Sequence, residues 1–221
     1  MNGIKVYVAS AKPLKDTIWF ERLYSTVPLE RRDKIDKLRL EKDKRLSLGS
    51  CLLLEKALSD WGINRYTLCY GPNGKPYIQA ERRIFFNVSH SEERLLCAVS
   101  DEEVGCDVEK VRDISVRVAK RFFSPEEYAK IAEKETAEEQ QDMFFRLWTL
   151  KESFMKVTGL GLKLPLDSFG IEMRGEEIRV RQAVDSGPYY FKEYHLDNEY
   201  KYAVCGRTPY FTAPEVVSFT I

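Results

Sequence analysis

The stretch that decides the fold is Trp148-Thr149-Leu150-Lys151-Glu152-Ser153-Phe154-Met155-Lys156, the second half of a predicted long helix. Gly159 and Gly161 follow it and predict where the helix ends. At 3.6 residues per turn, one stripe of the helix carries Phe144, Leu147, Lys151, Phe154 and Met155, and the adjacent stripe carries Phe145, Trp148, Glu152 and Lys156. Lys151 therefore interrupts an apolar face, and Glu152 adjoins it.

Charged residues on an apolar face have two explanations. A buried Lys or Glu is costly unless it is paired or bound to a metal, so the helix indicates a site that handles negative charge and a cation. Alternatively, Glu152 and Lys156 form a surface pair at i, i+4, worth about 0.3–0.5 kcal/mol, and Lys151 reaches solvent along its stem. The helix alone leaves both open.

Composition limits the class of protein. The 221 residues are 43% hydrophobic and 12% aromatic, which is enough to build the core of one large domain or of two small lobes. Lys+Arg and Asp+Glu both number 35, so the net charge is zero and no field of the whole molecule favours nucleic acid or an anionic membrane. We therefore expect neither as a partner, and any anion site must be local.

Cysteine use and the N-terminus bear on localisation. The five cysteines are odd in number and scattered, which argues against a disulfide framework and a zinc cluster and indicates reduced thiols. The N-terminus has no basic-then-apolar signal, and the apolar runs are shorter than the roughly 20 residues that span a bilayer. We expect a soluble, cytoplasmic protein.

Strand and helix patterns occur in both halves of the chain. A charged helical block runs from Leu29 to Leu58, and Asp113–Phe123 predicts a short helix. Alternating or apolar runs predict strands at 4–8, 66–70, 84–88, 95–99, 104–108, 169–173, 178–181, 189–194 and 200–205. We predict an α+β fold of two lobes, 1–103 and 104–221.

Two helix starts are marked by capping boxes. Ser124-Pro125-Glu126-Glu127 supplies an N-cap serine, a proline at the first helical position and a glutamate at N3. Thr136-Ala137-Glu138-Glu139 is a second such box and is the predicted start of the long helix. Glu127 thus has a purely structural explanation.

Asp107 and Glu109 carry the second sharp signal. In an extended strand residues i and i+2 point the same way, so these two carboxylates share one face of Val104-Gly105-Cys106-Asp107-Val108-Glu109. Two carboxylates so close to each other repel unless a cation lies between them. Mg²⁺ prefers hard oxygen ligands of this kind. The alternative is an exposed pair on an edge strand.

Three further stretches are candidates with equally ordinary explanations. Gly74-Lys75-Pro76 places a lysine at a turn where backbone can approach a ligand, or it is a plain loop. Asn87-Val88-Ser89-His90-Ser91 ends a strand with polar side chains, or it is a transition to a turn with an exposed histidine. The charged run from Lys37 to Arg45 is a solvated helix face or a local phosphate site.

Taken in order, these motifs resemble those of the 4′-phosphopantetheinyl transferases. The matching stretches are Gly74-Lys75-Pro76, Asn87 to Ser91, Gly105 to Glu109, Phe123 to Glu127 and Trp148 to Lys156. The resemblance is to the larger monomeric type, which activates peptide-synthetase and polyketide carrier proteins, and it covers about residues 74–161 by motif. It implies two similar α/β lobes, each with a small antiparallel sheet, and an active site in the cleft between them.

The resemblance implies a reaction and its metal. Phosphopantetheine moves from coenzyme A to a serine of an acyl or peptidyl carrier protein, and adenosine 3′,5′-bisphosphate is released. By this resemblance Asp107, Glu109 and Glu152 are the Mg²⁺ ligands, and the metal bridges the coenzyme's pyrophosphate. Glu152 is also the candidate base for the serine proton, directly or through a water.

The same resemblance implies phosphate contacts. Lys151 and Lys156 neutralise the pyrophosphate, and Lys156 thereby takes part in catalysis. By the resemblance, coenzyme A is also held by Lys75, Ser89 and His90 and, more loosely, by Arg45 and Lys37. His90 would contact the 3′-phosphate. The 1–103 lobe would contact coenzyme A, and the 104–221 lobe would carry the metal, the catalytic residues and a carrier-docking surface at Val111–Phe123. Glu127 matches a family glutamate, so it is either catalytic or only a cap.

Two other functions compete with this interpretation. A Mg²⁺-dependent nuclease would need a basic track along the phosphate backbone, and the balanced charge argues against one. A non-catalytic module that binds coenzyme A or a carrier would need the lysines but not three carboxylates. The sequence leaves open which carrier protein is served and whether acylated coenzyme A is accepted.

Overall fold

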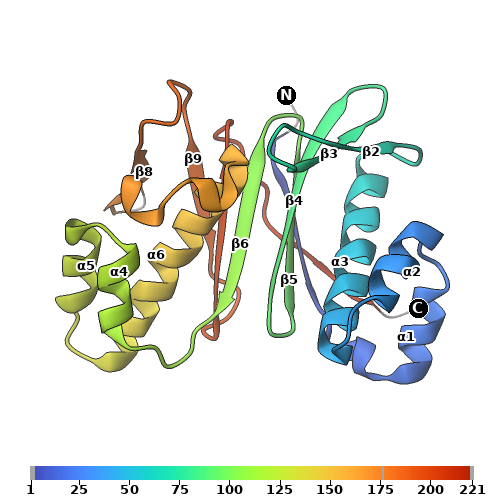
Figure 1. The fold of residues 1–221 in the computed structure, drawn as a ribbon, viewed down its shortest axis with the longest axis horizontal. Helices are drawn as coiled ribbons and strands as arrows, with labels where there is room; N and C mark the ends of the chain where they lie inside the picture. Colours follow the sequence, from blue (N-terminus) through green and yellow to red (C-terminus); the bar gives the residue numbers. More distant parts are fainter. Residues whose placement is uncertain (1–2, 176, 220–221) are drawn as a thin grey trace.

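The computed structural model describes residues 3–175 and 177–219 and shows an α+β protein of two lobes side by side (Figure 1). Strand β4 (Arg83–Ser91) of the first lobe and strand β6 (Val104–Lys110) of the second run next to each other where the lobes meet. The predicted division near residue 103 falls in the turn that leads into β6. None of the helices within the described ranges is long and apolar enough to cross a membrane.

The first lobe is a six-stranded sheet in the order β11-β1-β5-β4-β3-β2. Its remaining strands are β1 (Lys5–Ser10), β2 (Thr67–Tyr70), β3 (Pro76–Gln79), β5 (Arg94–Ser100) and β11 (Glu215–Val217). The pairs β1–β5, β5–β4, β4–β3 and β3–β2 are antiparallel. Strands β3 and β11 were not predicted, because each is short and begins or lies beside a proline-containing segment.

Helices cover one face of this sheet. They are α1 (Thr17–Tyr24), α2 (Leu29–Asp36) and α3 (Glu41–Asp60), preceded by the 3₁₀ turn η1 (Lys12–Lys15). Helix α3 lies against the sheet and α1 and α2 lie outside it (Figure 1). The predicted single block from Leu29 to Leu58 is therefore two helices, because the chain is extended at Leu40 just before α3 begins.

The second lobe combines two smaller sheets with helices. The sheets are β6-β10-β9 and the hairpin β7-β8. Their other strands are β7 (Gly170–Arg174), β8 (Glu177–Arg181), β9 (Tyr190–Tyr194) and β10 (Tyr200–Gly206). The helical segments are η2 (Val116–Val118), α4 (Ala119–Phe122), α5 (Pro125–Ala132), α6 (Ala137–Thr158), η3 (Gly161–Lys163) and η4 (Leu166–Ser168). The predicted helix over Asp113–Phe123 is thus shorter than expected.

Helix α6 is the long helix that the sequence predicted. Thr136 and Glu139 form the capping box at its start, and Gly159 ends it with φ 69°. The helix packs on β6 and β10, and Gly105 makes that packing possible. A Cβ added at Gly105 would lie 2.2 Å from the backbone oxygen of Ser153, so only glycine allows this approach. The close contact brings the last turns of α6 over the carboxylates of β6.

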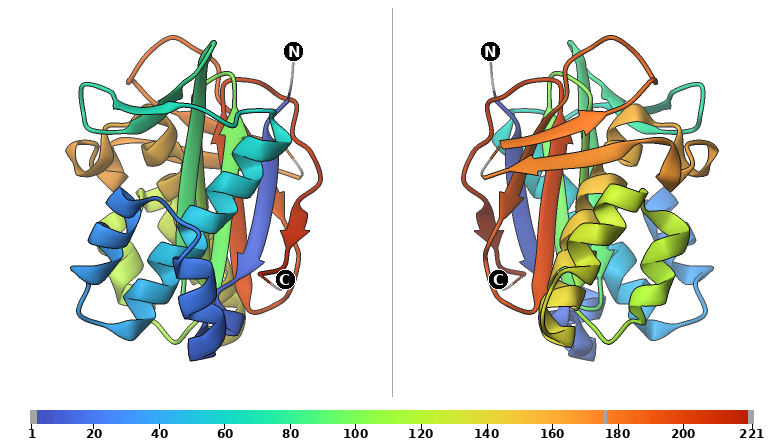
Figure 2. Two further views of the ribbon diagram at one scale, coloured as in Figure 1. Left: turned by 90° about the vertical axis from the view of Figure 1, so that its right-hand side faces the viewer. Right: turned by 90° about the vertical axis from the view of Figure 1, so that its left-hand side faces the viewer.

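The end of the chain returns to the first lobe. β11 pairs in parallel with β1, and Phe219 is buried in the core under α3. Figure 2 shows β11, in red, beside the blue β1. The predicted second lobe of residues 104–221 is therefore too long, because its last strand and Phe219 complete the first lobe.

An apolar core also joins the lobes. Its members come from β1 and β5 on one side and from β6 and β10 on the other, and include Val6, Leu96, Val108 and Tyr202. Polar bonds supplement it at the strand pair, where Cys106 donates its N–H to Asn87 Oδ1 at 2.9 Å. Burial of apolar side chains between the lobes makes them one packed unit.

Candidate functional site

Two serines of β4 bond two carboxylates of β6 across the boundary between the lobes. Ser89 Oγ donates to Asp107 Oδ1 at 2.7 Å, and Ser91 Oγ donates to Glu109 Oε2 at 2.7 Å. The spacing follows from the two-residue period of a strand, since Ser89 and Ser91 share one face of β4 just as Asp107 and Glu109 share one face of β6. The predicted pairing of the two carboxylates on one face is confirmed.

Lys156 completes this group from the last turn of α6. Its Nζ lies 2.5 Å from Asp107 Oδ1 and 2.9 Å from Ser89 Oγ. The Lys156 side chain is 28% exposed and that of Asp107 is 5% exposed, so solvent reaches part of the lysine and little of the carboxylate. Burial is the largest influence on the pKa of Lys156 and acts to lower it, but the charge and hydrogen bond of Asp107, together with the charges of other neighbours such as Glu152, raise that pKa overall.

Glu152 lies one helical turn before Lys156 and faces the same group. Burial raises its pKa, and the negative charges of Asp107 and Glu109 raise it further. Burial also raises the pKa of Glu109, with the charge of Asp107 adding to the effect. The three carboxylates therefore act on one another electrostatically. We call Asp107, Glu109 and Glu152, together with Lys156, the acidic cluster.

The chemistry of the acidic cluster fits a hard divalent cation. Asp107 Oδ2 is buried and has no hydrogen-bond partner, although a buried carboxylate oxygen normally has one. Oxygen donors and excess negative charge are what Mg²⁺ selects. No three or more His, Cys, Asp or Glu side chains of residues 3–175 and 177–219 are already arranged to hold a metal. The carboxylates instead bond to Lys156 and the two serines.

His90 lies between Ser89 and Ser91 on β4, so its exposed side chain leaves the strand on the face opposite the two serines, at the rim of the cluster on the α3 side. Burial of the ring lowers its pKa, and the neighbouring charge of Lys156 lowers it further. The imidazole is thus neutral near pH 7 in the free protein. An anion bound beside the ring would favour the protonated, positively charged imidazole.

Arg45 and Lys37 are placed by the helices of the first lobe. Arg45 is half-buried on α3 and lines a hollow with Lys15, Glu92 and Glu93, which are close to the end of β4. Lys37 is exposed immediately after α2. Among the contacts of the described residues, neither side chain bonds to the acidic cluster, so both remain predictions.

Lys75 joins the two lobes. Its Nζ donates to the backbone oxygens of Val104 at 2.8 Å and Val157 at 3.0 Å, which belong to β6 and α6. Burial lowers the pKa of Lys75 to about 8. Near it, Lys163 of η3 donates to Asn73 at 2.9 Å, so the β2–β3 hairpin is held both to the end of α6 and to η3. The structure gives the Lys75 ammonium a backbone role in addition to the predicted contact with a nucleotide.

Lys151 is not part of the cluster, which corrects the prediction that it binds pyrophosphate. Its side chain is 0% exposed and its Nζ bonds both carboxylate oxygens of Glu127 at 2.8 Å. The ammonium also donates to the Phe169 oxygen at 2.7 Å and lies 4.3 Å from the centre of the Phe169 ring. Its hydrogen-bonding capacity is fully used, because an ammonium has three protons.

Glu127 uses its carboxylate to hold three segments together. Besides Lys151, it accepts from the N–H of Ser124 at 2.8 Å and from the N–H of Ile171 at 2.7 Å. It is 1% exposed, so no substrate in solution reaches it in this arrangement. Glu127 is therefore a cap and a structural partner, as its capping box indicated, and the alternative of a catalytic role loses support.

Ser91 is the site residue whose role the sequence analysis missed. It stands in the motif from Asn87 to Ser91, but no partner for it was predicted. The signal was present, since Ser91 lies two residues after Ser89 and Glu109 lies two residues after Asp107. Equal spacing on two neighbouring strands predicts two equivalent contacts.

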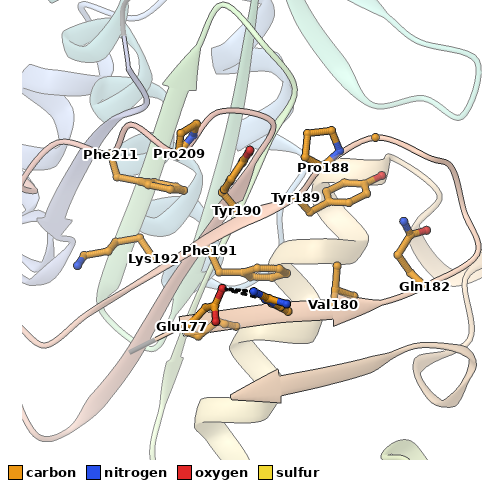
Figure 3. Close-up of a pocket in the computed structure, with 13 residues that line it drawn as sticks. Glu177, Val180, Gln182, Pro188, Tyr189, Tyr190, Phe191, Lys192, Pro209 and Phe211 are labelled. Atoms are coloured by element: carbon orange, nitrogen blue, oxygen red, sulfur yellow. Dashed lines mark hydrogen bonds and ion pairs between the residues drawn. The ribbon is translucent and has the colours of Figure 1, made fainter. Parts of the chain in front are cut away.

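A separate groove lies on the outer side of the second lobe. It has a volume of about 610 Å³ and is formed by β8, β9 and the segment around Pro209. Figure 3 shows its aromatic lining, which includes Tyr190, Phe191 and Phe211. None of the predicted site residues lines this groove. The volume of this groove therefore favours one place as the functional site, and the carboxylates favour another. We take the acidic cluster as the candidate site, because it contains the charged groups that can act on a phosphate.

Comparison with known proteins agrees with the geometry. Residues 103–205 match the family model described as the 4′-phosphopantetheinyl transferase superfamily. A 4′-phosphopantetheinyl transferase of Bacillus subtilis is 36% identical over 195 residues, covering 86% of this chain and 87% of the relative. The transferase Sfp of Bacillus subtilis strain 168 is 35% identical over the same shares, and one of Bacillus pumilus is 31% identical over 93% of this chain and 91% of its own length.

These similarities extend over most of both chains and beyond the segment that carries the acidic cluster. The fold and the cluster define a two-lobed protein with a group of carboxylates and a lysine at the boundary between its lobes. The chain belongs to the 4′-phosphopantetheinyl transferase family. The family resemblance predicted from its motifs is thus confirmed, and the nuclease and the non-catalytic module are not favoured.

Proposed function

We propose that this chain transfers the 4′-phosphopantetheine group from coenzyme A to a serine of an apo acyl or peptidyl carrier protein and releases adenosine 3′,5′-bisphosphate. The observation that carries the proposal is the acidic cluster. Asp107, Glu109 and Glu152 converge with Lys156 at the boundary between the lobes. Family membership supplies the reaction class, and the cluster supplies groups suited to a substituted phosphate.

Asp107, Glu109 and Glu152 are the residues that would hold Mg²⁺. The buried, unpartnered Oδ2 of Asp107 and the mutual repulsion of the carboxylates support this assignment. When bound, the ion offsets the charge on the pyrophosphate and on the leaving phosphate. Ser89 and Ser91 hold Asp107 and Glu109 in orientation from the neighbouring strand.

Glu152 is the proposed base for the serine hydroxyl. In the metal-free protein burial raises its pKa, with the charges of Asp107 and Glu109 adding to the effect, and its place beside the proposed metal brings it near the attacking hydroxyl. The hydroxyl proton passes to Glu152, directly or through a water, while the serine oxygen attacks the phosphorus that carries the pantetheine. The bond from that phosphorus to the bridging pyrophosphate oxygen breaks, and adenosine 3′,5′-bisphosphate leaves with the bridging oxygen. Lys156 offers its positive charge to the phosphate oxygens as charge accumulates there.

Ser89 and His90 lie next to the cluster on the side of the first lobe, and Lys75 lies farther along the lobe boundary at the start of β6. We place the nucleotide part of coenzyme A on this side. His90 is neutral in the free protein, so a phosphate beside it would raise its pKa and draw in a proton. Binding of the 3′-phosphate then strengthens as the pH falls toward the ordinary range of histidine. Arg45 and Lys37 are proposed as additional phosphate contacts from the same lobe.

The carrier protein is proposed to dock on Val111–Phe123. Basic side chains point outward along this segment, since Arg112, Arg117, Lys120 and Arg121 are all exposed. Its apolar residues largely face inward, as Phe123 is buried and Phe122 packs edge-on against Trp148 at 5.6 Å. The segment follows β6 directly, so a carrier held there has its serine near Asp107 and Glu109.

The protein is proposed to work as a monomer in the cytoplasm. Cys51, Cys69, Cys97, Cys106 and Cys205 are free thiols in the structure, as a reducing compartment favours. The cluster needs no residue from a second copy, because both lobes of one chain supply it.

The proposal is tested by incubating the protein with coenzyme A, Mg²⁺ and a panel of apo carrier proteins from fatty-acid, polyketide and peptide synthesis. Intact mass is expected to show addition of one phosphopantetheine to the serine of at least one carrier. A carrier with that serine changed to alanine is the control. Absence of modification across the whole panel would refute the proposed function.

A further inference from the structure

Lys156 occupies a position that a cation bound to Asp107 would compete for. Its ammonium is 2.5 Å from Asp107 Oδ1, and the other oxygen of the same carboxylate is buried without a partner. Two cations beside one carboxylate repel each other, and the repulsion is strong where water is scarce. The free protein therefore already holds a positive charge at its proposed metal site.

We propose that Lys156 is an internal counter-ion that binds Asp107 in the free protein and moves to the pyrophosphate when coenzyme A binds. This inference rests on the proposed function and deepens it. In the free protein the ammonium neutralises Asp107 and weakens the attraction of the site for Mg²⁺. Pyrophosphate gives Lys156 a second anionic partner and releases Asp107. Mg²⁺ and coenzyme A consequently bind with positive coupling through this one side chain.

The surroundings of Lys156 allow this movement. Its side chain is 28% exposed and lies on the last turns of α6, so solvent reaches part of the side chain. Asp107 stays in place when the ammonium leaves, because Ser89 Oγ still donates to Oδ1 at 2.7 Å. Lys151, which is five residues earlier and 0% exposed, has no open side and no comparable freedom.

Coupling of this kind is reciprocal and measurable. If coenzyme A tightens metal binding by some factor, metal tightens coenzyme A binding by the same factor. We expect a factor of at least ~5, the lower end of typical coupling between sites. Direct contact between the metal and the pyrophosphate contributes part of this coupling. The part that depends on Lys156 should disappear when residue 156 has no charge.

The experiment measures Mn²⁺ binding by electron paramagnetic resonance, with and without coenzyme A, in the wild type and in single variants. Lys156→Met removes the charge, and Lys156→Arg keeps it. Lys163→Met is the matched control, because Lys163 also bonds across the lobes but contacts Asn73 instead of a carboxylate. Thermal melting of each variant establishes that it is folded, and Lys156→Gln replaces the Met variant if that one is not.

Without coenzyme A, Lys156→Met is expected to bind Mn²⁺ roughly 5-fold or more tightly than the wild type, and to show less tightening when coenzyme A is added. Lys156→Arg and Lys163→Met are expected to resemble the wild type. Unchanged or weaker Mn²⁺ binding by folded Lys156→Met without coenzyme A would overturn the inference.

Carrier modification by the wild type is measured on the same preparation. This measurement distinguishes failure of the proposed function from failure of the counter-ion role of Lys156. Transfer by the wild type together with unchanged Mn²⁺ binding in Lys156→Met overturns the counter-ion role alone. Absence of transfer to any carrier overturns the proposed function, whatever the Mn²⁺ titrations show.

Discussion

Helix α6 carries two lysines, each paired with a carboxylate, and the pairs differ in what surrounds them. Lys151 and Glu127 are 0% and 2% exposed, and their hydrogen bonds are complete. Lys156 and Asp107 are 28% and 5% exposed, and Asp107 keeps an oxygen without a partner. The Lys151–Glu127 pair, which we call the sealed pair, has no free hydrogen-bonding group for a ligand. The Lys156–Asp107 pair, which we call the open pair, has a carboxylate oxygen without a partner and is partly exposed to solvent, as a ligand-binding site requires.

The difference arises from one helical turn. Lys151 lies on the stripe that faces α5 and β7, whereas Lys156 lies on the adjacent stripe that faces β6 across Gly105. Charge in an apolar helix face therefore has two causes in this protein. One is a structural ion pair that fixes three segments, and the other is the proposed substrate site.

Asp107→Ala should have the largest effect and breaks the open pair. We expect transfer to the carrier to fall by at least ~10²–10³-fold, because a proposed metal ligand and the partner of Lys156 are both lost. The fold should persist, since a small carboxylate contributes little packing. Intact mass of the carrier measures transfer, and a thermal melt checks the fold.

Removing Mg²⁺ from the wild type should reproduce this loss, and adding it back should reverse it. Near-normal transfer by Asp107→Ala at low millimolar Mg²⁺ would show that the metal is held elsewhere.

Lys151→Met breaks the sealed pair and should act on stability. Leaving Glu127 buried without its counter-ion is expected to lower the free energy of unfolding by ~3–5 kcal/mol. Lys156→Met should cost only about 1–2 kcal/mol, because solvent reaches its neighbourhood. Urea denaturation monitored by fluorescence compares the two. Equal losses of stability would mean that the two pairs do not differ as their exposure indicates.

The sequence predicted the open pair better than the sealed one, for a physical reason. Asp107 and Glu109 follow a two-residue period that any strand imposes, so their common face was predictable. The partner of Lys151 depends on how α5 packs against α6 and β7, which are distant along the chain. The capping box at Ser124 and Glu127 gave Glu127 its own explanation and concealed its second contact.

The architecture shows the same limit. Strands with clear alternation and the capped helix α6 were predicted, because their signals are local. The return of the tail to β1 was not, since β11 has three residues and gains its stability from a strand at the other end of the chain. Lys75 was predicted as a ligand contact, but its bonds to Val104 and Val157 depend on how the lobes meet.

His90→Ala tests the rim of the open pair. We expect the Michaelis constant for coenzyme A to rise by roughly 10-fold while kcat changes little, because the contact is remote from the reacting phosphorus. The same variant should discriminate less between coenzyme A and dephospho-coenzyme A than the wild type does. Unchanged discrimination would place the 3′-phosphate away from His90.

Arg117→Glu combined with Arg121→Glu tests the surface next to the sealed pair. Reversing two exposed charges should raise the Michaelis constant for the carrier severalfold and leave that for coenzyme A nearly unchanged, with the defect shrinking in high salt. Arg174→Glu with Arg179→Glu is the control, because both arginines are exposed on the β7–β8 hairpin. Equal effects of the two double variants would move docking off Val111–Phe123.

The smallest effect concerns Lys75, a partly buried lysine that extends the comparison because its acceptors are backbone oxygens and not a carboxylate. Burial lowers the pKa of Lys75 to about 8 in the folded protein, whereas the unfolded chain keeps a value near 10.5. Between those two values the unfolded state binds more protons, so this residue's contribution to stability rises as the pH rises. Below pH 8 both states are protonated, and the cost of burying the charge is fully present.

The stability of the wild type relative to Lys75→Met should therefore increase from about pH 8 to pH 10, by roughly 1–2 kcal/mol. Urea denaturation of both proteins across this range measures the difference, and other titrating groups cancel because they are common to both. A difference that stays flat or falls with pH would mean that Lys75 remains charged, with its two carbonyl acceptors replacing the water that burial removes.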